Sequence, residues 1–247
     1  MNHVTRRLER ILISALIALA TVAGAVDSGQ AQVLTQPRKP APLPPVVRAA
    51  PAAPSVATPA PEAPVVAEIT GFRSAHFGMT EPDVRRAIEN DFRARPDEIR
   101  SEENKAEQTQ VAIVRVPDAL PGGGTASISY VFGFKTKKLI QVGLSWSKAT
   151  DEKMTPEQLF SNANILRTHF LEAGYKPDTI STNMPVNGGV LMFRGSDAHE
   201  RTTVMILQGT FSQGENNQRV LTPTALLLFY IADAKNPDVY RLPEGSF

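Results

Sequence analysis

The side chains best suited to catalysis or metal binding in this chain are its histidines, and they are few. The sequence holds four, and three of them lie beyond the first 67 residues, at His76, His169 and His199. A catalytic histidine needs an orienting carboxylate and a nucleophile within hydrogen-bond reach. The spacing around these three supplies neither, so we expect surface or packing roles for them.

The segment that comes nearest to a set of metal ligands is 197–200, with an aspartate, a histidine and a glutamate. It lies between two apolar runs, where a hairpin must turn, and no second ligand pair follows at a set spacing. The glycines at 122–124 precede a strand pattern, whereas phosphate-binding glycines precede a helix. We therefore expect loops here, no metal or cofactor site, and a non-catalytic protein.

Two helices are expected to position whatever the chain binds. Thr80 and Thr155 can each cap a helix, with Pro82 and Pro156 in the tolerated first turn. Apolar residues then recur at helical spacing after both caps, which predicts one buried stripe on each helix. Gly174 is a natural stop for the second helix.

Alternating apolar and polar residues predict strands after each helix, joined by short loops that favour antiparallel neighbours. The predicted strands are 98–102, 109–116, 125–134 and 139–147 after the first helix, and 179–183, 190–194, 202–209 and 225–232 after the second. We expect an α+β domain over 68–247, made of two tandem repeats (about 68–148 and 149–235) and a tail (236–247). Each repeat is one helix followed by three to four antiparallel strands, with the helices packed on one face of the sheet.

Side-chain alternation in two neighbouring strands separates an apolar face from a small, polar one. The apolar face is expected under the helices, and the other face is expected to be open and smooth. The candidate binding residues on that second face are Ser127, Ser129, Gln141, Gly143 and Ser145.

The first 67 residues indicate where in the cell the protein works. Arginines at 6, 7 and 10 precede an apolar run at 11–26, and small residues follow, which is typical of a secretory signal peptide over 1–31. We expect residues 32–67 to be a Pro/Ala-rich disordered spacer, because ten prolines fall between Pro37 and Pro64 and such a composition prefers extended polyproline II. We expect a periplasmic or secreted protein, or one anchored in the inner membrane through 11–26 if the signal is not cut.

Charge and cysteine content narrow the class of partner. Six of the 26 basic and three of the 25 acidic residues fall in the first 67, which leaves the rest with a net charge of about −2. No basic field remains to recruit nucleic acid. The chain has no cysteine, so disulfides, thiol catalysis and the acylated cysteine of lipoproteins are excluded.

Short motifs carry a family resemblance. Residues 77–80 with Val84, followed by the strand pair around 130–132 and 139–142, resemble the SmpA/OmlA-type domain of a small outer-membrane assembly lipoprotein. The doubling resembles the beta-lactamase-inhibitor-protein fold. The chain departs from that lipoprotein in lacking its cysteine. The resemblance implies a binding or assembly module rather than an enzyme.

Three functions remain open from the sequence. The first is an exported binding or scaffold module that meets a protein or another cell-envelope component. The second is an envelope hydrolase with a dispersed site, which would need His169 or His199 to meet a carboxylate. The third is a small-ligand or lipid carrier, with a cavity lined by Tyr130, Phe132 and Trp146.

Overall fold

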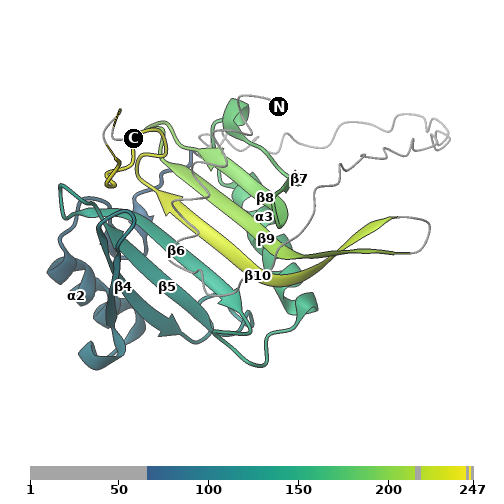
Figure 1. The fold of residues 1–247 in the computed structure, drawn as a ribbon, viewed down its shortest axis with the longest axis horizontal. Coiled ribbons are helices and arrows are strands. Elements are labelled where there is room, and N and C mark those ends of the chain that lie inside the picture. The colour runs from purple at the N-terminus through teal and green to yellow at the C-terminus, as the bar shows by residue number, and fades with distance from the viewer. Residues whose placement is uncertain (1–65, 215–217, 243–244, 246–247) are drawn as a thin grey trace, which may run out of the picture. The chain divides into compact units, whose positions relative to one another are not determined.

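Eight antiparallel strands form one sheet in the order β3-β4-β5-β6-β10-β9-β8-β7 (Figure 1). The computed structural model describes residues 66–214, 218–242 and 245, so the predicted signal peptide and nearly all of the predicted spacer lie outside the described residues. The strands are β3 (Arg100–Asn104), β4 (Thr109–Val116), β5 (Ala126–Phe132), β6 (Leu139–Ser147), β7 (Met184–Val186), β8 (Gly189–Ser196), β9 (Thr202–Gln213) and β10 (Arg219–Ile231). A separate two-stranded sheet consists of β1 (Gly71–Phe72) and β2 (Ala75–His76).

Both predicted helix starts are confirmed. Helix α2 (Glu81–Phe92) and helix α3 (Pro156–Glu172) begin after Thr80 and Thr155, whose side chains accept a hydrogen bond from the backbone N–H three residues on. Each cap satisfies one of the amides that a helix start leaves unpaired. Short 3₁₀ helices span Pro96–Glu98 and Pro177–Thr179. Neither α-helix is both long and apolar enough to cross a membrane.

The predicted fold class, α+β with two tandem repeats, is wrong. The fold is mostly β, with two α-helices among the described residues and a single eight-stranded sheet beside the small one. The physical reason lies in β10, which pairs with β9 on one side and with β6 on the other, from Ala225 opposite Ser147 to Ile231 opposite Gln141. If the first repeat were a separate unit, β6 would be an edge strand with unpaired backbone groups. Strand β10 pairs with this edge of β6, so the strands of the two expected repeats form one sheet.

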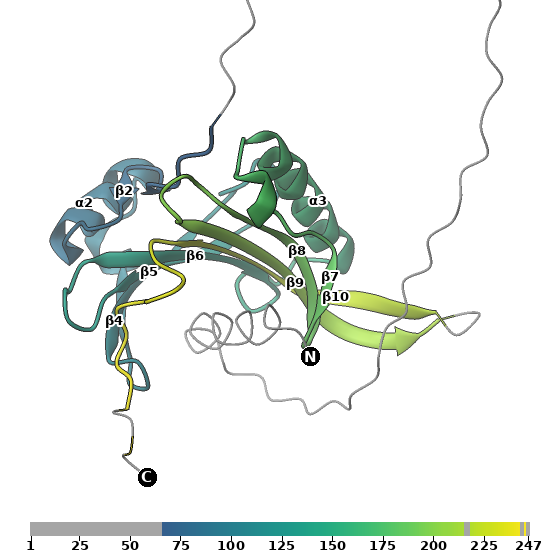
Figure 2. The same ribbon diagram turned by 90° about the horizontal axis from the view of Figure 1, so that it is seen from above.

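The sheet is arched, and both α-helices lie on its convex side (Figure 2). The main core lies between these helices and the sheet, where Val84 and Ile88 of α2 and Leu159 and Phe170 of α3 pack against one side-chain parity of the strands. The other parity points to the concave side, on which no described helix lies. We call this concave side the second face.

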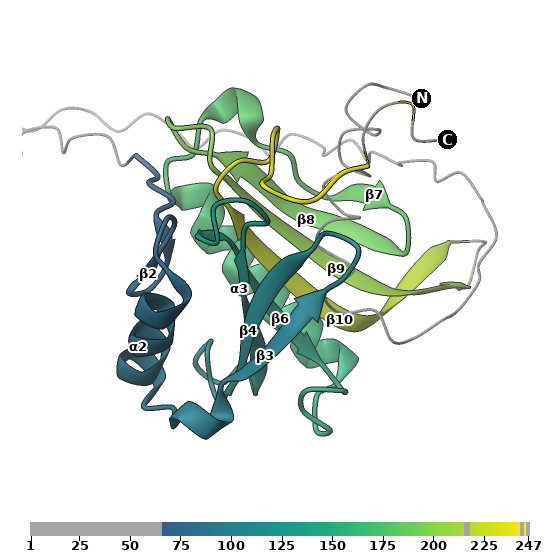
Figure 3. The same cartoon turned by 60° about the vertical axis from the view of Figure 1, so that its left-hand side comes forward.

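Some local predictions also need correction. The strand expected at 179–183 is a 3₁₀ helix that ends at Thr179, followed by an isolated bridge from Ser181 to Arg194. The neighbouring turn at 187–188 joins β7 to β8 as its Asn-Gly sequence predicts. Strand β9 extends to Gln213 and β10 begins at Arg219, beyond the predicted bounds at 209 and 225, and these extensions form a two-stranded ribbon that projects from the sheet (Figures 1 and 3).

Candidate binding face and its pocket

Strands β5 and β6 bring the five predicted binding residues onto the second face. Ser127 pairs with Ser145 in register, and the next pair on this face joins Ser129 to Gly143. The Ser129 hydroxyl donates a hydrogen bond to the Gly143 carbonyl oxygen at 3.3 Å. Ser129 and Ser145 are buried, whereas Ser127 and Gln141 are half-buried. We call these five residues the strip. Its most accessible side chains are those of Ser127 and Gln141.

The second face is not small and polar across its width, contrary to the expectation. An apolar cluster flanks the strip on each side. The cluster on β4–β6 holds Val111, Ile113, Val131 and Ile140, and the cluster on β8–β10 holds Leu191, Val204, Ile206, Leu227, Phe229 and Ile231. The reason is that β4 and β10 carry apolar side chains on both parities, so each contributes to the main core and to this face.

Gly143 lets the side chains of Ser129 and Phe229 approach its backbone closely. It pairs with Phe229 of β10. A Cβ atom there would lie 3.2 Å from carbons of the Phe229 ring and 2.8 Å from the Ser129 hydroxyl oxygen. The absence of a side chain is therefore required by packing at this position, which accounts for one of the small residues that the sequence pattern singled out.

A cavity of about 110 Å³ lies at one end of the second face, between β4, β6 and the segment that follows β10. We call it the pocket. Its apolar wall includes Val111, Val131, Ile140, Ile231 and Val239. Its polar lining includes Glu107, Thr109, Gln141, Asp233 and Asp238. No lysine, arginine or histidine lines it, so its charged groups are all carboxylates.

Two lining side chains belong to the β3–β4 hairpin and are buried. Glu107 is 8 % exposed and accepts a hydrogen bond from the Asn104 side-chain amide at 3.1 Å. Thr109 is fully buried, and its hydroxyl oxygen has no hydrogen-bond partner among the described residues. A buried hydroxyl without a partner costs about 1–3 kcal/mol. Because Thr109 is fully buried, its hydroxyl is not accessible from the pocket.

The segment after β10 forms the outer wall of the pocket and passes beside β4 (Figure 2, yellow). The Asp238 carboxylate fixes it by accepting hydrogen bonds from the backbone N–H groups of Lys135 and Thr136 at 3.0 and 2.9 Å. Burial opposes ionisation of Asp238, but the Thr136 and Lys135 hydrogen bonds outweigh it and lower the pKa of this carboxyl. Further along, the Tyr240 N–H donates to the Glu107 carbonyl at 2.9 Å.

A larger cleft of about 530 Å³ lies on the helix side, between residues 66–73 and the end of α3. Aromatic rings line it, and those of Phe72 and Tyr230 stack with centroids 5.8 Å apart. Burial raises the pKa of the Tyr230 hydroxyl above its ordinary value. None of the buried, unpartnered side-chain atoms in the described part of the chain lines this cleft. Its size suits a small molecule, but nothing in it calls for a particular ligand.

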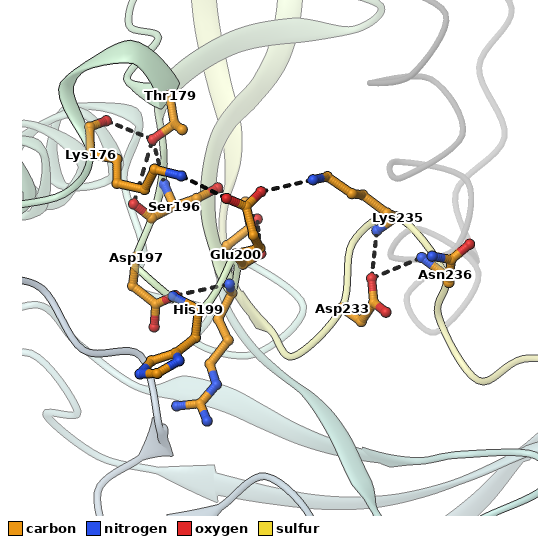
Figure 4. A network of polar contacts seen from close by, with 11 residues as sticks. Lys176, Thr179, Ser196, Asp197, His199, Glu200, Asp233, Lys235 and Asn236 are labelled. Atoms are coloured by element: carbon orange, nitrogen blue, oxygen red, sulfur yellow. Dashed lines mark hydrogen bonds and ion pairs between the residues drawn. The ribbon is translucent and has the colours of Figure 1, made fainter.

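The segment 197–200 is a hairpin turn, as predicted, and Asp197 organises it (Figure 4). Asp197 is 1 % exposed. One of its carboxylate oxygens accepts from the N–H of His199 at 2.8 Å and of Arg201 at 2.9 Å. The other accepts from the Ile69 N–H at 2.9 Å. This aspartate therefore ties the entering chain to the β8–β9 turn.

Glu200, in the same turn, forms ion pairs with Lys176 at 2.6 Å and with Lys235 at 2.8 Å (Figure 4). Hydrogen bonds from these two ammonium groups lower the pKa of Glu200 to about 2. Among the residues that the structure describes, no three histidine, aspartate or glutamate side chains gather as metal ligands. The acidic residues of this turn act as hydrogen-bond and ion-pair partners.

The two alternative functions gain no support from these contacts. No hydrogen bond recorded between described residues joins a ring nitrogen of His76, His169 or His199 to a carboxylate, which a hydrolase would need. The three residues proposed to line a carrier cavity, Tyr130, Phe132 and Trp146, are at most 1 % exposed and line neither cavity.

Sequence reasoning missed Glu107 and Thr109. The sequence could have placed Thr109 on the second face, because it lies two residues before Val111 in the same strand and so shares its face. Glu107 gave no signal, since a glutamate in a polar hairpin turn is ordinarily exposed. Its burial depends on contact with a segment more than 120 residues later in the chain.

Comparison with known proteins returned nothing similar: the chain matches no family model, no curated protein and no solved structure. The resemblance to an outer-membrane assembly domain therefore stays a prediction.

Proposed function

We propose that this chain is an exported binding or scaffold module of the cell envelope, and that its second face holds a segment of a partner protein. One observation carries the proposal: an arched sheet has both helices on one side and two apolar clusters on the other, around a narrow strip of serine and glycine. The half-buried positions Ser127 and Gln141 keep the strip within reach of a partner.

The accessibility of the face limits where a partner can make contact. Nine of the ten cluster residues are at most 8 % exposed, and Ile140 is half-buried. Gly143, Ser129 and Ser145 are buried as well. A partner segment would therefore reach the strip at its half-buried residues, Ser127 and Gln141.

The leader and spacer suit the same function. A secretory signal peptide would export the chain, and a proline-rich spacer would serve as a tether. Such a tether would let the module meet a partner away from the membrane, whether the chain is released into the periplasm or stays anchored through residues 11–26.

Site-specific photocrosslinking tests the proposal. A photoreactive phenylalanine analogue is placed at Ser127 or Gln141, the two accessible positions of the strip, and at Ser161 as a control. Ser161 is an exposed serine on α3, on the opposite side of the sheet. We expect the same partner protein, identified by mass spectrometry, in adducts from positions 127 and 141 and not from 161.

Two outcomes would overturn the proposal. One is an equal yield of the same adduct from position 161, which would place the contact elsewhere. The other is no protein adduct from positions 127 and 141 in cells where the full chain is exported and folded. As a second check, Ser127→Arg should reduce the adduct from position 141, whereas Ser161→Arg should leave it unchanged.

A further inference from the structure

We propose that one end of the sheet binds to a membrane surface that carries anionic phospholipids. Exposed cations gather at this end on three segments: Lys105 in the β3–β4 turn, Lys135, Lys137 and Lys138 in the β5–β6 turn, and Arg241 after β10. We call these five residues the basic patch. The patch lies at the end of the sheet rather than on the second face, so the inference goes beyond the proposed function and does not depend on it.

The segment after β10, yellow in Figure 1, holds the two turns of the patch together. The Phe134 N–H donates to the Asp238 carbonyl at 2.8 Å, and the Tyr240 N–H donates to the Glu107 carbonyl at 2.9 Å. The rings of Phe134 and Tyr240 pack edge to face, with centroids 5.4 Å apart. The cations of the patch are therefore carried by backbone segments that are fixed to one another.

The patch has an excess of positive charge that the chain does not neutralise. Residues 104–108, 133–138 and 237–242 hold five cations and two carboxylates, those of Glu107 and Asp238. Neither carboxylate is freely exposed: Glu107 is 8 % exposed, and Asp238 accepts two backbone N–H groups of the β5–β6 turn. None of the five cations forms an ion pair with a residue that the structure describes. This end of the sheet therefore favours an anionic partner.

The shape of the patch favours an extended anionic surface over a small anion. None of the five cations lines either of the two cavities described above, so a free phosphate would find no enclosed site among them. Cations on three separate segments suit an array of lipid phosphates, which offers many negative groups in one plane. Each lysine or arginine near such a surface strengthens binding about fivefold.

An exposed apolar side chain lies next to the patch in the sequence. Leu242 follows Arg241 and is 59 % exposed. Apolar side chains beside basic ones are typical of segments that bind at the membrane interface, where the apolar group enters the headgroup region. The half-buried Tyr240 precedes them, and tyrosine is enriched at membrane interfaces. The predicted signal peptide brings the chain to a membrane, so a tethered module can reach its surface.

A local fluorescent label on the full chain tests the proposal. The chain has no cysteine, so Ala106→Cys carries a single environment-sensitive fluorophore at the patch. Ala149→Cys carries the same label at the opposite end of the sheet, and both alanines are exposed. We expect the label at 106 to shift its emission to the blue with vesicles of phosphatidylcholine and phosphatidylglycerol, and to return as salt is added. Vesicles of phosphatidylcholine alone should have little effect.

Three outcomes of the label experiment would overturn the proposal. The first is an equal shift with phosphatidylcholine alone, and the second is an equal shift from the label at 149, since the leader could produce either without the patch. The third is displacement of the anionic vesicles by inorganic phosphate at the concentration of the lipid phosphate, which would identify the patch as a site for a free anion.

Matched charge variants assign the binding to the patch. Lys135→Gln/Lys138→Gln should weaken the binding reported by the label at 106 about 25-fold, at about fivefold for each lysine. Lys148→Gln/Lys153→Gln removes two exposed lysines at the opposite end of the sheet and should leave the binding unchanged. The melting temperature of each variant shows whether it is folded.

The exposed carboxylates of β3 beside the patch give a change in the opposite direction. Glu102→Gln/Glu103→Gln removes two negative charges and should strengthen binding to the anionic vesicles. Unchanged binding in a folded Lys135→Gln/Lys138→Gln protein would refute the membrane proposal, while crosslinks from positions 127 and 141 would still support the partner-binding face.

Discussion

Two hairpin turns of this molecule bury a carboxylate, and they do so differently. Asp197, between β8 and β9, accepts three backbone N–H groups. Glu107, between β3 and β4, lies beside Thr109, whose buried hydroxyl has no partner among the described residues. A buried polar group that is satisfied from within the chain contributes to the fold. Both turns are also held to a segment distant in sequence, the first through the Asp197 side chain and the second through the backbone carbonyl of Glu107, which accepts from the Tyr240 N–H.

The largest effect that tests this comparison is expected at Asp197. Asp197→Ala leaves the N–H groups of Ile69, His199 and Arg201 without their acceptor, so the free energy of unfolding should fall by about 3 kcal/mol or more. Asp97→Ala is the control, because the Asp97 side chain is 75 % exposed and its ion pair with Arg95 is a surface one. That change should cost at most about 0.5 kcal/mol. Urea denaturation measures both, and similar losses in the two variants would contradict a structural role for Asp197.

The outer wall of the pocket provides the next test, at Gly133. A Cβ atom there would lie 2.2 Å from an Asp238 carboxylate oxygen, so Gly133→Ala must displace the segment that Asp238 fixes. We expect a loss of about 1–3 kcal/mol in the free energy of unfolding, measured by urea denaturation.

A double-mutant cycle identifies the cause of that loss. Asp238→Ala removes the group with which the added methyl collides, so the double variant Gly133→Ala/Asp238→Ala should lose less stability than the two single losses together. Strict additivity would show that Gly133 is needed for some reason other than its contact with Asp238.

The helix caps test the same principle with a single N–H group. Thr155→Ala removes the acceptor for the Gln158 N–H, which is 3.2 Å from the Thr155 hydroxyl oxygen, and should cost about 1 kcal/mol. Thr155→Ser keeps the hydroxyl and should retain most of the stability, while Thr168→Ala, at an exposed position within α3, serves as the control for helix propensity. A loss in Thr155→Ala as large as that in Asp197→Ala would break the link between stability and the number of amides satisfied.

The features that could be predicted from the sequence are those that depend on interactions between residues close in the chain. The caps at Thr80 and Thr155 were predictable because donor and acceptor are three residues apart. Strand alternation likewise placed Ser127, Ser129, Gln141, Gly143 and Ser145 on one face, because parity is a local property of the backbone.

The remaining features depend on long-range pairing that the sequence pattern does not encode. Ile69 and Asp197 are 128 residues apart, and Thr136 and Asp238 are 102 apart. The same holds for the pairing of β10 with β6, which merges two expected repeats into one sheet and overturned the predicted fold class. The pocket escaped notice for this reason, since its outer wall comes from a segment distant in sequence.

The smallest expected effect concerns Glu200, which shares a turn with Asp197 but is accessible to solvent. The pKa of Glu200 is lowered from 4.5 to about 2 by hydrogen bonds from Lys176 and Lys235. A carboxyl whose pKa is lower in the folded state stabilises the fold above its unfolded pKa, and that contribution is lost as the pH falls from about 4.5 to about 2. The stability difference between the native protein and Glu200→Gln should therefore shrink over this interval. NMR titration of the Glu200 carboxyl carbon measures the pKa directly, and Lys176→Ala should raise it. A Glu200 that titrates near 4.5 in the native protein would show that its two ion pairs are not maintained in solution, and that in this turn only Asp197 acts on the fold.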